Sequence, residues 1–287
     1  MMGNTKQKTS GKIIQGSFYI FFILLTLGLT HINNDNLNYF LKTSGNRPYG
    51  IAFDNKGAMF IVTAPETGNG MLSKVNPDGK ITNLAVIVGN FIGPGICFDN
   101  DNNILITAGE KLLKVSLEGK CKIIADGFSR CFDVKVDKNN IIYVADDLQG
   151  TIYRINSSGT KNIFYKSDTV GSFVLTSIIL DKNNENLYAR DGNKILKFNI
   201  KPDSTSRNPQ LIIDNIKMFY LCIDSNNVLY ASTLDNVIKI NPGGKVEYLS
   251  QKALGTSLGL AAGGKGFDEN FLYVTVEDGI VQLPIPK

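Results

Sequence analysis

Hydrophobic and polar positions alternate in short runs along most of the chain, and small polar turns separate the runs. In residues 131–159 (CFDVKVDKNNIIYVADDLQGTIYRINSSG), three runs rich in Val, Ile and Tyr are divided by segments of Asn, Asp and Gly. This pattern is typical of antiparallel strands joined by tight turns. Helical periodicity is nearly absent after residue 46. The pattern therefore predicts an all-β protein.

The same pattern recurs about every 40 residues, which is a period found in repeat architectures. The first strand of each of five units ends at Asp54, Asp99, Asp137, Asp181 and Asp224, and that of a sixth unit ends at Gly263–Gly264. A large apolar residue follows in the second strand of every unit: Phe60, Leu105, Tyr143, Tyr188, Tyr230 and Tyr273. A third strand, a turn and a fourth strand complete most units.

Four antiparallel strands per repeat indicate the blade of a β-propeller, and the chain length fits six blades. The sixth unit ends after its third strand, so it lacks a fourth. Residues 37–42 (LNYFLK) have the pattern to supply it. We therefore predict a six-bladed β-propeller whose last blade is closed by an N-terminal strand, which hides an exposed sheet edge.

The N-terminal residues have the pattern of a targeting segment. Residues 1–30 combine a lysine-bearing start with the apolar stretch 18–29 (FYIFFILLTLGL), the length of a signal-peptide core. Counted from Ile13, the apolar stretch is long enough for a retained signal anchor. We expect residues 1–30 to be a signal peptide or a signal anchor, and residues 31–287 to form the propeller. The protein is then secreted or extracytoplasmic, or anchored to a membrane through residues 13–30.

Charge and residue usage exclude several functions. The formal net charge is +4, and three of the cations (Lys6, Lys8 and Lys12) belong to the N-terminal segment, so no basic stripe is left for nucleic acid. The one histidine, His31, argues against a His-based triad. The four cysteines lack zinc-site spacing. A disulfide between Cys121 and Cys131 is one open possibility for an exported protein.

Across residues 46–285 the units resemble NHL repeats and the senescence marker protein/gluconolactonase-like propellers. The segment 48–54 (PYGIAFD) is similar to the blade opening of both groups, and 142–146 (IYVAD) is similar to their second strand. The segments 197–203 (KFNIKPD) and 271–275 (FLYVT) are similar to later blades of the gluconolactonase-like group. This resemblance implies the propeller fold but guides function only weakly, because propellers serve many functions.

The resemblance also implies a divalent cation, such as calcium or zinc, in the central channel. Its ligands would be a Glu before the first unit and an Asn or Asp at the start of several innermost strands, since hard cations take oxygen ligands. At these starting positions the chain has Tyr49, Pro94, Phe132, Thr176, Phe219 and Leu258. No Glu lies between Asp35 and Glu66, and Asp133 is one residue past its expected position. We therefore predict that the metal site is lost and that no cofactor is bound.

The candidate ligand-binding residues come from these starting positions and from polar residues near them. Their aromatic and apolar side chains either pack together and plug the channel or line a pocket for an apolar or flat ligand. Asp146 and Asp191 end second strands, where they either form turns or mark a functional sector in the third and fourth blades. The full candidate set is Arg47, Tyr49, Arg130, Phe132, Asp133, Asp146, Asp191, Phe219 and Leu258.

Two functions follow from these observations. The leading hypothesis is an exported binding module for a protein, a peptide or a small apolar ligand. The alternative is a metal-dependent lactonase or esterase-type hydrolase that has rebuilt its metal site from displaced residues such as Asp133, Asp146 and Asp191.

Overall fold

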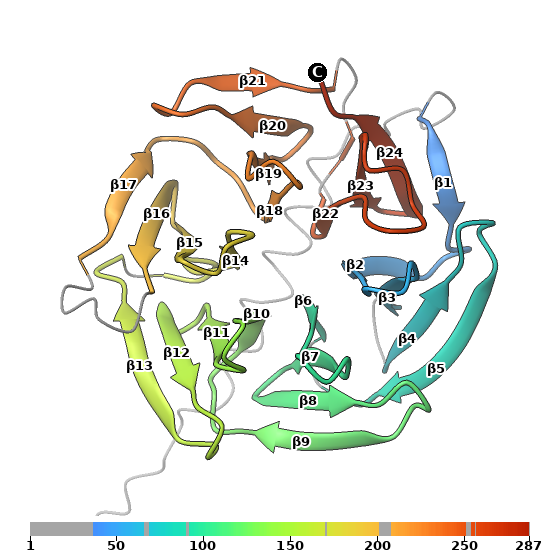
Figure 1. Cartoon of the computed structure of the whole chain (residues 1–287), viewed down its shortest axis with the longest axis horizontal. Helices are drawn as coiled ribbons and strands as arrows, with labels where there is room; N and C mark the ends of the chain where they lie inside the picture. Colours follow the sequence, from blue (N-terminus) through green and yellow to red (C-terminus); the bar gives the residue numbers. More distant parts are fainter. Residues whose placement is uncertain are drawn as a thin grey trace, which may run out of the picture. The chain divides into compact units, whose positions relative to one another are not determined.

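The computed structural model describes residues 37–65, 69–89, 92–169, 171–200, 208–250, 254–255 and 257–286. Its strands form six four-stranded antiparallel sheets arranged in a ring (Figure 1). Blade 1 contains β2 (Arg47–Phe53), β3 (Met59–Ala64), β4 (Gly70–Val75) and β5 (Ile81–Ile87). Blade 2 contains β6 (Ile92–Phe98), β7 (Ile104–Ala108), β8 (Lys111–Val115) and β9 (Cys121–Ala125). Blade 3 contains β10 (Cys131–Val136), β11 (Ile142–Asp146), β12 (Thr151–Ile155) and β13 (Lys161–Lys166).

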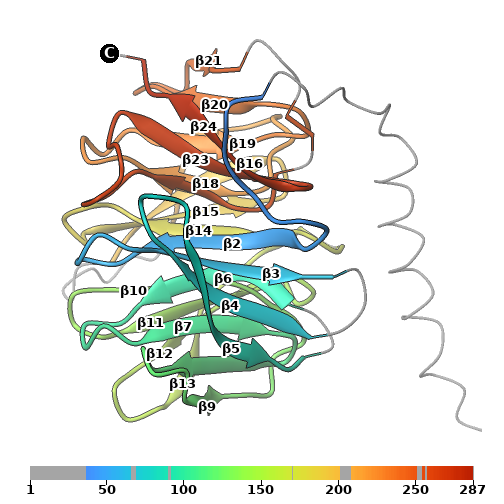
Figure 2. The same cartoon turned by 90° about the vertical axis from the view of Figure 1, so that its right-hand side faces the viewer.

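The remaining blades repeat this order. Blade 4 contains β14 (Ser177–Leu180), β15 (Asn186–Asp191), β16 (Lys194–Asn199) and β17 (Gln210–Ile213). Blade 5 contains β18 (Leu221–Ile223), β19 (Leu229–Ser232), β20 (Val237–Ile240) and β21 (Val246–Tyr248). Blade 6 contains β22 (Leu260–Ala262), β23 (Phe271–Val276), β24 (Gly279–Pro284) and the N-terminal strand β1 (Tyr39–Lys42). The predicted six-bladed propeller is confirmed, and Figure 2 shows the ring edge-on.

The last blade is closed as the sequence predicts. Strand β1 pairs antiparallel with β24, with Leu41 opposite Ile280 and Lys42 opposite Gly279. The Tyr39 hydroxyl donates a 2.6 Å hydrogen bond to Asp278 beyond the strand pair. The strand begins at Tyr39 rather than at Leu37, which instead packs against the blade 6 core. The closing strand therefore covers the outer edge of β24 with both backbone and side-chain bonds.

The repeated Asp residues fold the turn between the first and second strands. In five blades one carboxylate oxygen of the Asp accepts two backbone N–H groups further along the turn. In blade 3, for example, Asp137 Oδ1 accepts the N–H groups of Asn139 and Ile141, each at 2.9 Å. An Asp side chain that satisfies turn donors in this way fixes the hairpin locally. The spacing of the Asp residues is therefore the spacing of the hairpins.

An Asn in the same turn joins neighbouring blades. Asn140, Asn184 and Asn227 have left-handed backbones, with φ between 55° and 62°. Their side-chain oxygens accept the backbone N–H of the preceding blade's turn, from Asn100 at 3.3 Å, Lys138 at 3.2 Å and Lys182 at 2.8 Å, respectively. Asn tolerates this conformation better than most residues. The three bonds join blade 2 to blade 3, blade 3 to blade 4, and blade 4 to blade 5.

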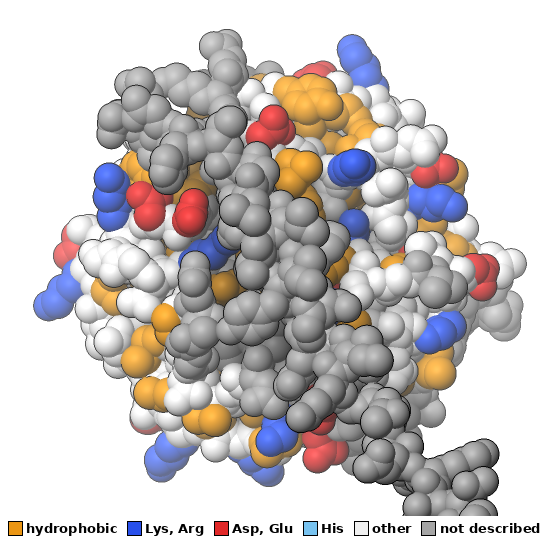
Figure 3. Space-filling model, turned by 180° about the vertical axis from the view of Figure 1, so that it is seen from behind, with side chains coloured by type: hydrophobic (Ala, Val, Ile, Leu, Met, Phe, Trp, Pro, Cys, Tyr) orange, Lys and Arg blue, Asp and Glu red, His pale blue; other side chains and the backbone are white. Residues whose placement is uncertain are grey.

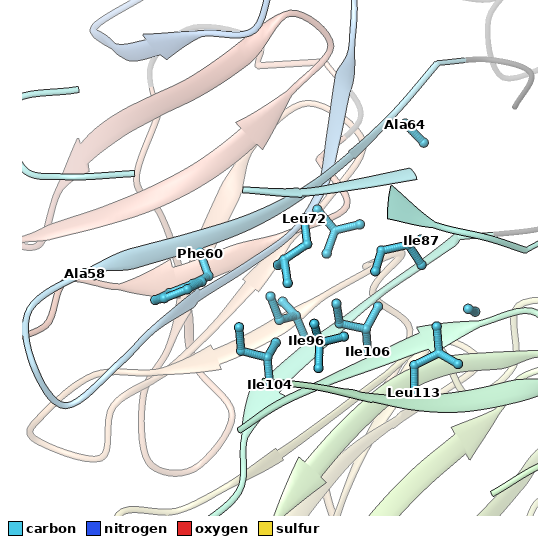
Figure 4. Packing of buried hydrophobic residues seen from close by; sticks show 12 residues of the cluster. Ala58, Phe60, Ala64, Leu72, Ile87, Ile96, Ile104, Ile106 and Leu113 are labelled. Atoms are coloured by element: carbon cyan, nitrogen blue, oxygen red, sulfur yellow. The ribbon is translucent and has the colours of Figure 1, made fainter. Parts of the chain in front are cut away.

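The core lies between adjacent blades, where side chains from facing sheets interdigitate. Between blades 1 and 2, Phe60 and Leu72 pack against Ile96, Ile104 and Ile106 (Figure 4). Five of the six predicted second-strand residues are at most 1% exposed, and Tyr188 is half-buried. Glycine in an innermost strand lets the neighbouring blade approach closely. A Cβ on Gly50 of β2 would lie 2.5 Å from the Pro94 carbonyl oxygen of β6.

The proposed disulfide is not formed, because all four cysteines are free. Cys121 is exposed at the start of an outermost strand, whereas Cys131 is buried at the start of an innermost strand of the next blade. The open possibility of a Cys121–Cys131 disulfide is therefore not realised, because a blade places its fourth strand at the rim and the first strand of the next blade at the axis.

Candidate functional site

The six innermost strands β2, β6, β10, β14, β18 and β22 surround the axis of the ring (Figure 1), and we call the region that they enclose the channel. We call the end where these strands begin the upper end and the end where they finish the lower end. All nine candidate residues lie at strand starts or at the ends of second strands, and therefore belong to the upper end. Whether these residues bind a ligand remains a prediction.

Four of the candidates lie at or just before the starts of the innermost strands β2, β18 and β22. Arg47 and Tyr49 lie on β2, where both are half-buried, and burial lowers the pKa of Arg47 below its ordinary value. Tyr49 packs against the core between blades 1 and 2. Phe219 and Leu258 are half-buried just before β18 and β22. The Phe219 carbonyl accepts a 2.8 Å hydrogen bond from Thr176 Oγ1, so its backbone joins blades 4 and 5.

Phe132 lies in a β-bulge at the start of β10. Cys131 pairs with Asp146 and Asp133 pairs with Ala145, so Phe132 is the extra residue between them. A bulge of this kind redirects side chains. Phe132 is 4% exposed and meets the ring of Phe173 edge-on, with 5.9 Å between ring centroids.

A buried ion pair lies beside these rings. Arg130 donates from Nε to Asp147 Oδ1 at 2.5 Å and from Nη2 to Asp147 Oδ2, and its guanidinium stacks 4.6 Å above the Phe173 ring. The Phe173 backbone has φ of 61°, a conformation that bulky residues rarely adopt. Asp147 accepts the Phe173 N–H at 3.1 Å and helps to hold it. Asp147 was missed by the sequence prediction, although two consecutive Asp residues at a strand end signal more than a turn.

Arg190 holds the same segment from blade 4. Its Nη1 donates to the Phe173 carbonyl oxygen and to Thr176 Oγ1, the latter at 3.1 Å. Burial lowers the pKa of Arg190 to about 10, against the opposing effect of Asp191. Asp191 itself accepts hydrogen bonds of 2.7 Å from Tyr165 and Ser167 in blade 3.

Asp146 and Asp191 therefore have bonding roles beyond local turns. Asp146 accepts the backbone N–H groups of Ser129 at 2.7 Å and Arg130 at 3.1 Å, which fixes the connection into β10. Asp191 joins blade 4 to the end of β13. Only the Asp191 bonds cross between blades 3 and 4, and a functional sector in these blades remains a prediction.

Asp133 is buried among three innermost strands and is 0% exposed. Its Oδ1 accepts from Lys135 Nζ at 2.6 Å, Tyr220 Oη at 2.9 Å and its neighbour's backbone N–H at 2.8 Å. Its Oδ2 accepts from Ser177 Oγ at 3.1 Å and the Ile178 N–H at 2.9 Å. Five donors therefore satisfy this carboxylate, and one of them is an ammonium.

Lys135, the ionic partner of Asp133, was not identified from the sequence. Besides Asp133, its Nζ donates to the Val134 carbonyl at 3.0 Å and contacts Tyr220 Oη at 3.4 Å. Among the described residues no group of three or more His, Cys, Asp or Glu side chains is placed to hold a metal ion. The predicted loss of the metal site remains a prediction.

A cavity of about 420 Å³ opens at the lower end of the channel. All six innermost strands or the turns that follow them contribute to its wall, and none of the nine candidate residues does. Its wall is mainly aliphatic and aromatic, with Cys97 and Cys222 on strands of blades 2 and 5. The charged residues in the wall are Asp54, Lys135 and Lys182.

No protein-family model matches the chain, and no curated protein matches it significantly in sequence. Solved structures do match its fold. A gluconolactonase from Xanthomonas campestris has a TM-score of 0.69 at 14% identity, covering 85% of this chain and 88% of that one. An auxiliary nutrient binding protein from Bacteroides thetaiotaomicron has a TM-score of 0.70 at 11% identity, covering 86% and 75%. A virginiamycin B lyase from Staphylococcus aureus has a TM-score of 0.60 at 15% identity, covering 87% and 98%.

These likenesses confirm that the chain has the gluconolactonase-like six-bladed propeller fold. At such low identity they show the fold alone, and the neighbours include both enzymes and a binding protein. Residues 1–36, which contain the predicted targeting segment and His31, lie outside the described residues. Within the described residues, no helix has the length and hydropathy to cross a membrane.

Proposed function

We propose that the protein is an exported β-propeller binding module that takes a small, largely apolar ligand into the lower cavity. The observation that carries this proposal is the cavity itself, which all six blades build from mainly apolar residues around one ion-paired lysine. Concave sites of a few hundred Å³ with apolar walls and few polar groups are typical of small-molecule binding. Export is proposed from the sequence of residues 1–30 alone.

The bonding of Asp133 supports a binding module over a metal-dependent hydrolase. To ligate a cation or take a proton from water, this carboxylate would have to give up donors that already satisfy it, including the Lys135 ammonium. Leaving a buried donor without a partner costs about 1–3 kcal/mol. The lactonase or esterase alternative is supported by the fold likeness only.

The proposal is tested by filling the cavity. Gly264 lines it, and a Cβ there would make only an ordinary 3.4 Å contact with Phe53. Gly264→Leu should therefore fold and project its side chain into the cavity, whereas Gly264→Ala adds one methyl group as the matched control. Thermal unfolding is measured with a panel of small apolar alcohols, acids and amides. A ligand of the folded state raises the unfolding temperature.

We expect at least one compound class to stabilise the wild type and Gly264→Ala but not Gly264→Leu. Equal stabilisation of all three proteins would place binding elsewhere and contradict the proposal. Lactone or ester hydrolysis that requires calcium or zinc and that Asp133→Asn abolishes without unfolding the protein would favour the hydrolase. Binding of a protein to the wild type and to Gly264→Leu alike would favour a protein partner.

A further inference from the structure

We infer that the ligand carries a carboxylate on its apolar body, and that Lys182 and Lys135 bind this group in the lower cavity. This inference rests on the proposed function and specifies the chemical class of the ligand. It follows from the charged groups that line the cavity and from the hydrogen bonds those groups already make.

Two ammonium groups and one carboxylate line the cavity: Lys135, Lys182 and Asp54. The Asp54 side chain is 7% exposed, and its Oδ1 accepts the backbone N–H groups of Lys56 and Ala58 at 2.9 and 2.8 Å. Asp54 is therefore engaged in its turn. Asp133 lies behind Lys135 and is not part of the wall. The Asp54 charge stays in the wall, but the two ammonium groups are the charged hydrogen-bond donors that line the cavity and can meet an acceptor on a ligand.

One of the three hydrogen bonds that the Lys135 ammonium donates is weak and can be exchanged for a ligand acceptor. Two of its three ammonium hydrogens are directed to Asp133 at 2.6 Å and the Val134 carbonyl at 3.0 Å. Its contact with Tyr220 Oη is 3.4 Å, longer than a well-formed hydrogen bond. A ligand oxygen that reaches Lys135 therefore displaces only this weak contact. Such an oxygen must accept hydrogen bonds, because an ammonium only donates.

Lys182 lies at the mouth of the cavity. It is exposed, and its backbone N–H donates at 2.8 Å to Asn227, which fixes its position at the seam between blades 4 and 5. Burial raises the pKa of the cavity thiol Cys222, and the nearby Lys182 charge opposes that rise. The ammonium is therefore close enough to act electrostatically on the cavity wall. A long, solvated side chain of this kind suits a carboxylate at the mouth.

The rest of the cavity wall selects an apolar body. Ile51, Ile96, Ile179 and Leu260 line the cavity from four different blades. Burial of apolar ligand surface against them is favourable, at about 25 cal/mol per Å². A medium-chain or aromatic monocarboxylate combines this body with the acceptor that the lysines require. Octanoate is the simplest probe of the class.

The test compares three probes of equal chain length by titration calorimetry on the full chain: octanoate, octanol and octylamine. Lys182→Gln removes the charge at the mouth. Lys138→Gln is the matched control, since Lys138 also follows the repeated Asp directly, but in blade 3 and outside the cavity wall. We expect octanoate to bind more tightly than octanol and octylamine to bind least. Lys182→Gln should weaken octanoate binding about threefold at low salt, the size of an exposed charge pair, and leave octanol binding unchanged.

Three outcomes separate the inference from the proposed function. A preference for octanoate that Lys182→Gln reduces and Lys138→Gln retains supports both. Octanol binding as tightly as octanoate, with no effect of Lys182→Gln, overturns the carboxylate but leaves the binding module standing. If Gly264→Leu binds all three probes as the wild type does, the lower cavity is not the site and both proposals fail.

Discussion

The Nζ atom of Lys135 lies 2.6 Å from Oδ1 of Asp133, so the cation beside this channel carboxylate is a side chain of the protein itself. Both residues belong to β10, two positions apart, and therefore project to the same side of the strand. Tyr220 from blade 5 and Ser177 from blade 4 complete the shell around the carboxylate. One ion pair thus connects three of the six blades at the channel.

Removing Lys135 should destabilise the fold strongly. Lys135→Met leaves the Asp133 carboxylate buried without its ionic partner, and a broken buried pair typically costs about 3–5 kcal/mol. The double variant Asp133→Asn/Lys135→Met removes both charges and should recover part of that loss. Urea unfolding measures each free energy. A cost below about 1 kcal/mol for the single variant, the size of an exposed ion pair, would mean that the pair contributes little.

The Asn bonds between blades should be measurable one at a time. Asn184 has a left-handed backbone, and its side chain accepts the Lys138 N–H. Asn184→Gly keeps that backbone but loses the acceptor, so we expect a loss of about 1 kcal/mol in unfolding free energy. Asn184→Asp retains an acceptor oxygen and should lose less. If the two variants unfolded alike, the bond across the seam would not be the source of the effect.

Asp99 should contribute to acid sensitivity. Burial opposes its ionisation, but hydrogen bonds from Lys114 and Asn103 outweigh burial and hold the pKa of Asp99 below its ordinary 3.8. A lowered folded-state pKa stabilises the protein above the ordinary value, and this contribution is lost as the pH falls through the folded-state pKa. Asp99→Asn should therefore flatten the dependence of unfolding free energy on pH below about 4. Asp101→Asn, in the same turn, controls for the loss of one charge.

The thiols should react in an order set by their surroundings. Cys121 is exposed, whereas burial raises the pKa of Cys97 to about 12 and leaves little reactive thiolate near neutral pH. Iodoacetamide at pH 8 should modify Cys121 first and Cys97 slowly, as followed by peptide mass spectrometry. Because Cys97 lines the lower cavity, a cavity ligand should slow its modification further and leave the rate at Cys121 unchanged. Faster modification at Cys97 than at Cys121 would contradict this order.

The fold could be predicted because its signals are local. Each repeated Asp bonds within its own turn, as Asp137 does with Ile141 four residues away, so spacing alone locates the hairpins. Residues 37–42 were recognised as the closing strand because the sixth unit lacked one. The Asn bonds between blades escaped prediction, since the partners of Asn184 and Asn227 are 46 and 45 residues away.

The site was less predictable because it is assembled across the ring. The resemblance directed attention to the starts of the innermost strands, but the cavity lies where those strands finish. In the sequence Lys135 has the pattern of an ordinary strand residue. Its contact with Tyr220, which directly precedes β18, exists only in the folded protein. Arg130 and Asp147 are 17 positions apart and meet only because β10 and β11 form a hairpin. Side-chain partners of this kind depend on tertiary packing, which periodicity does not encode.

The pairing of β1 with β24 has a consequence for biosynthesis. A ribosome makes Tyr39–Lys42 before the other described strands and Gly279–Pro284 after them, so the earliest described strand must wait for its partner until the other blades have been synthesised. Until then blade 6 lacks a complete sheet and the ring of blades stays open. A circular permutant that starts at β2 and ends with β1 would make each blade in one continuous stretch and should close without that delay.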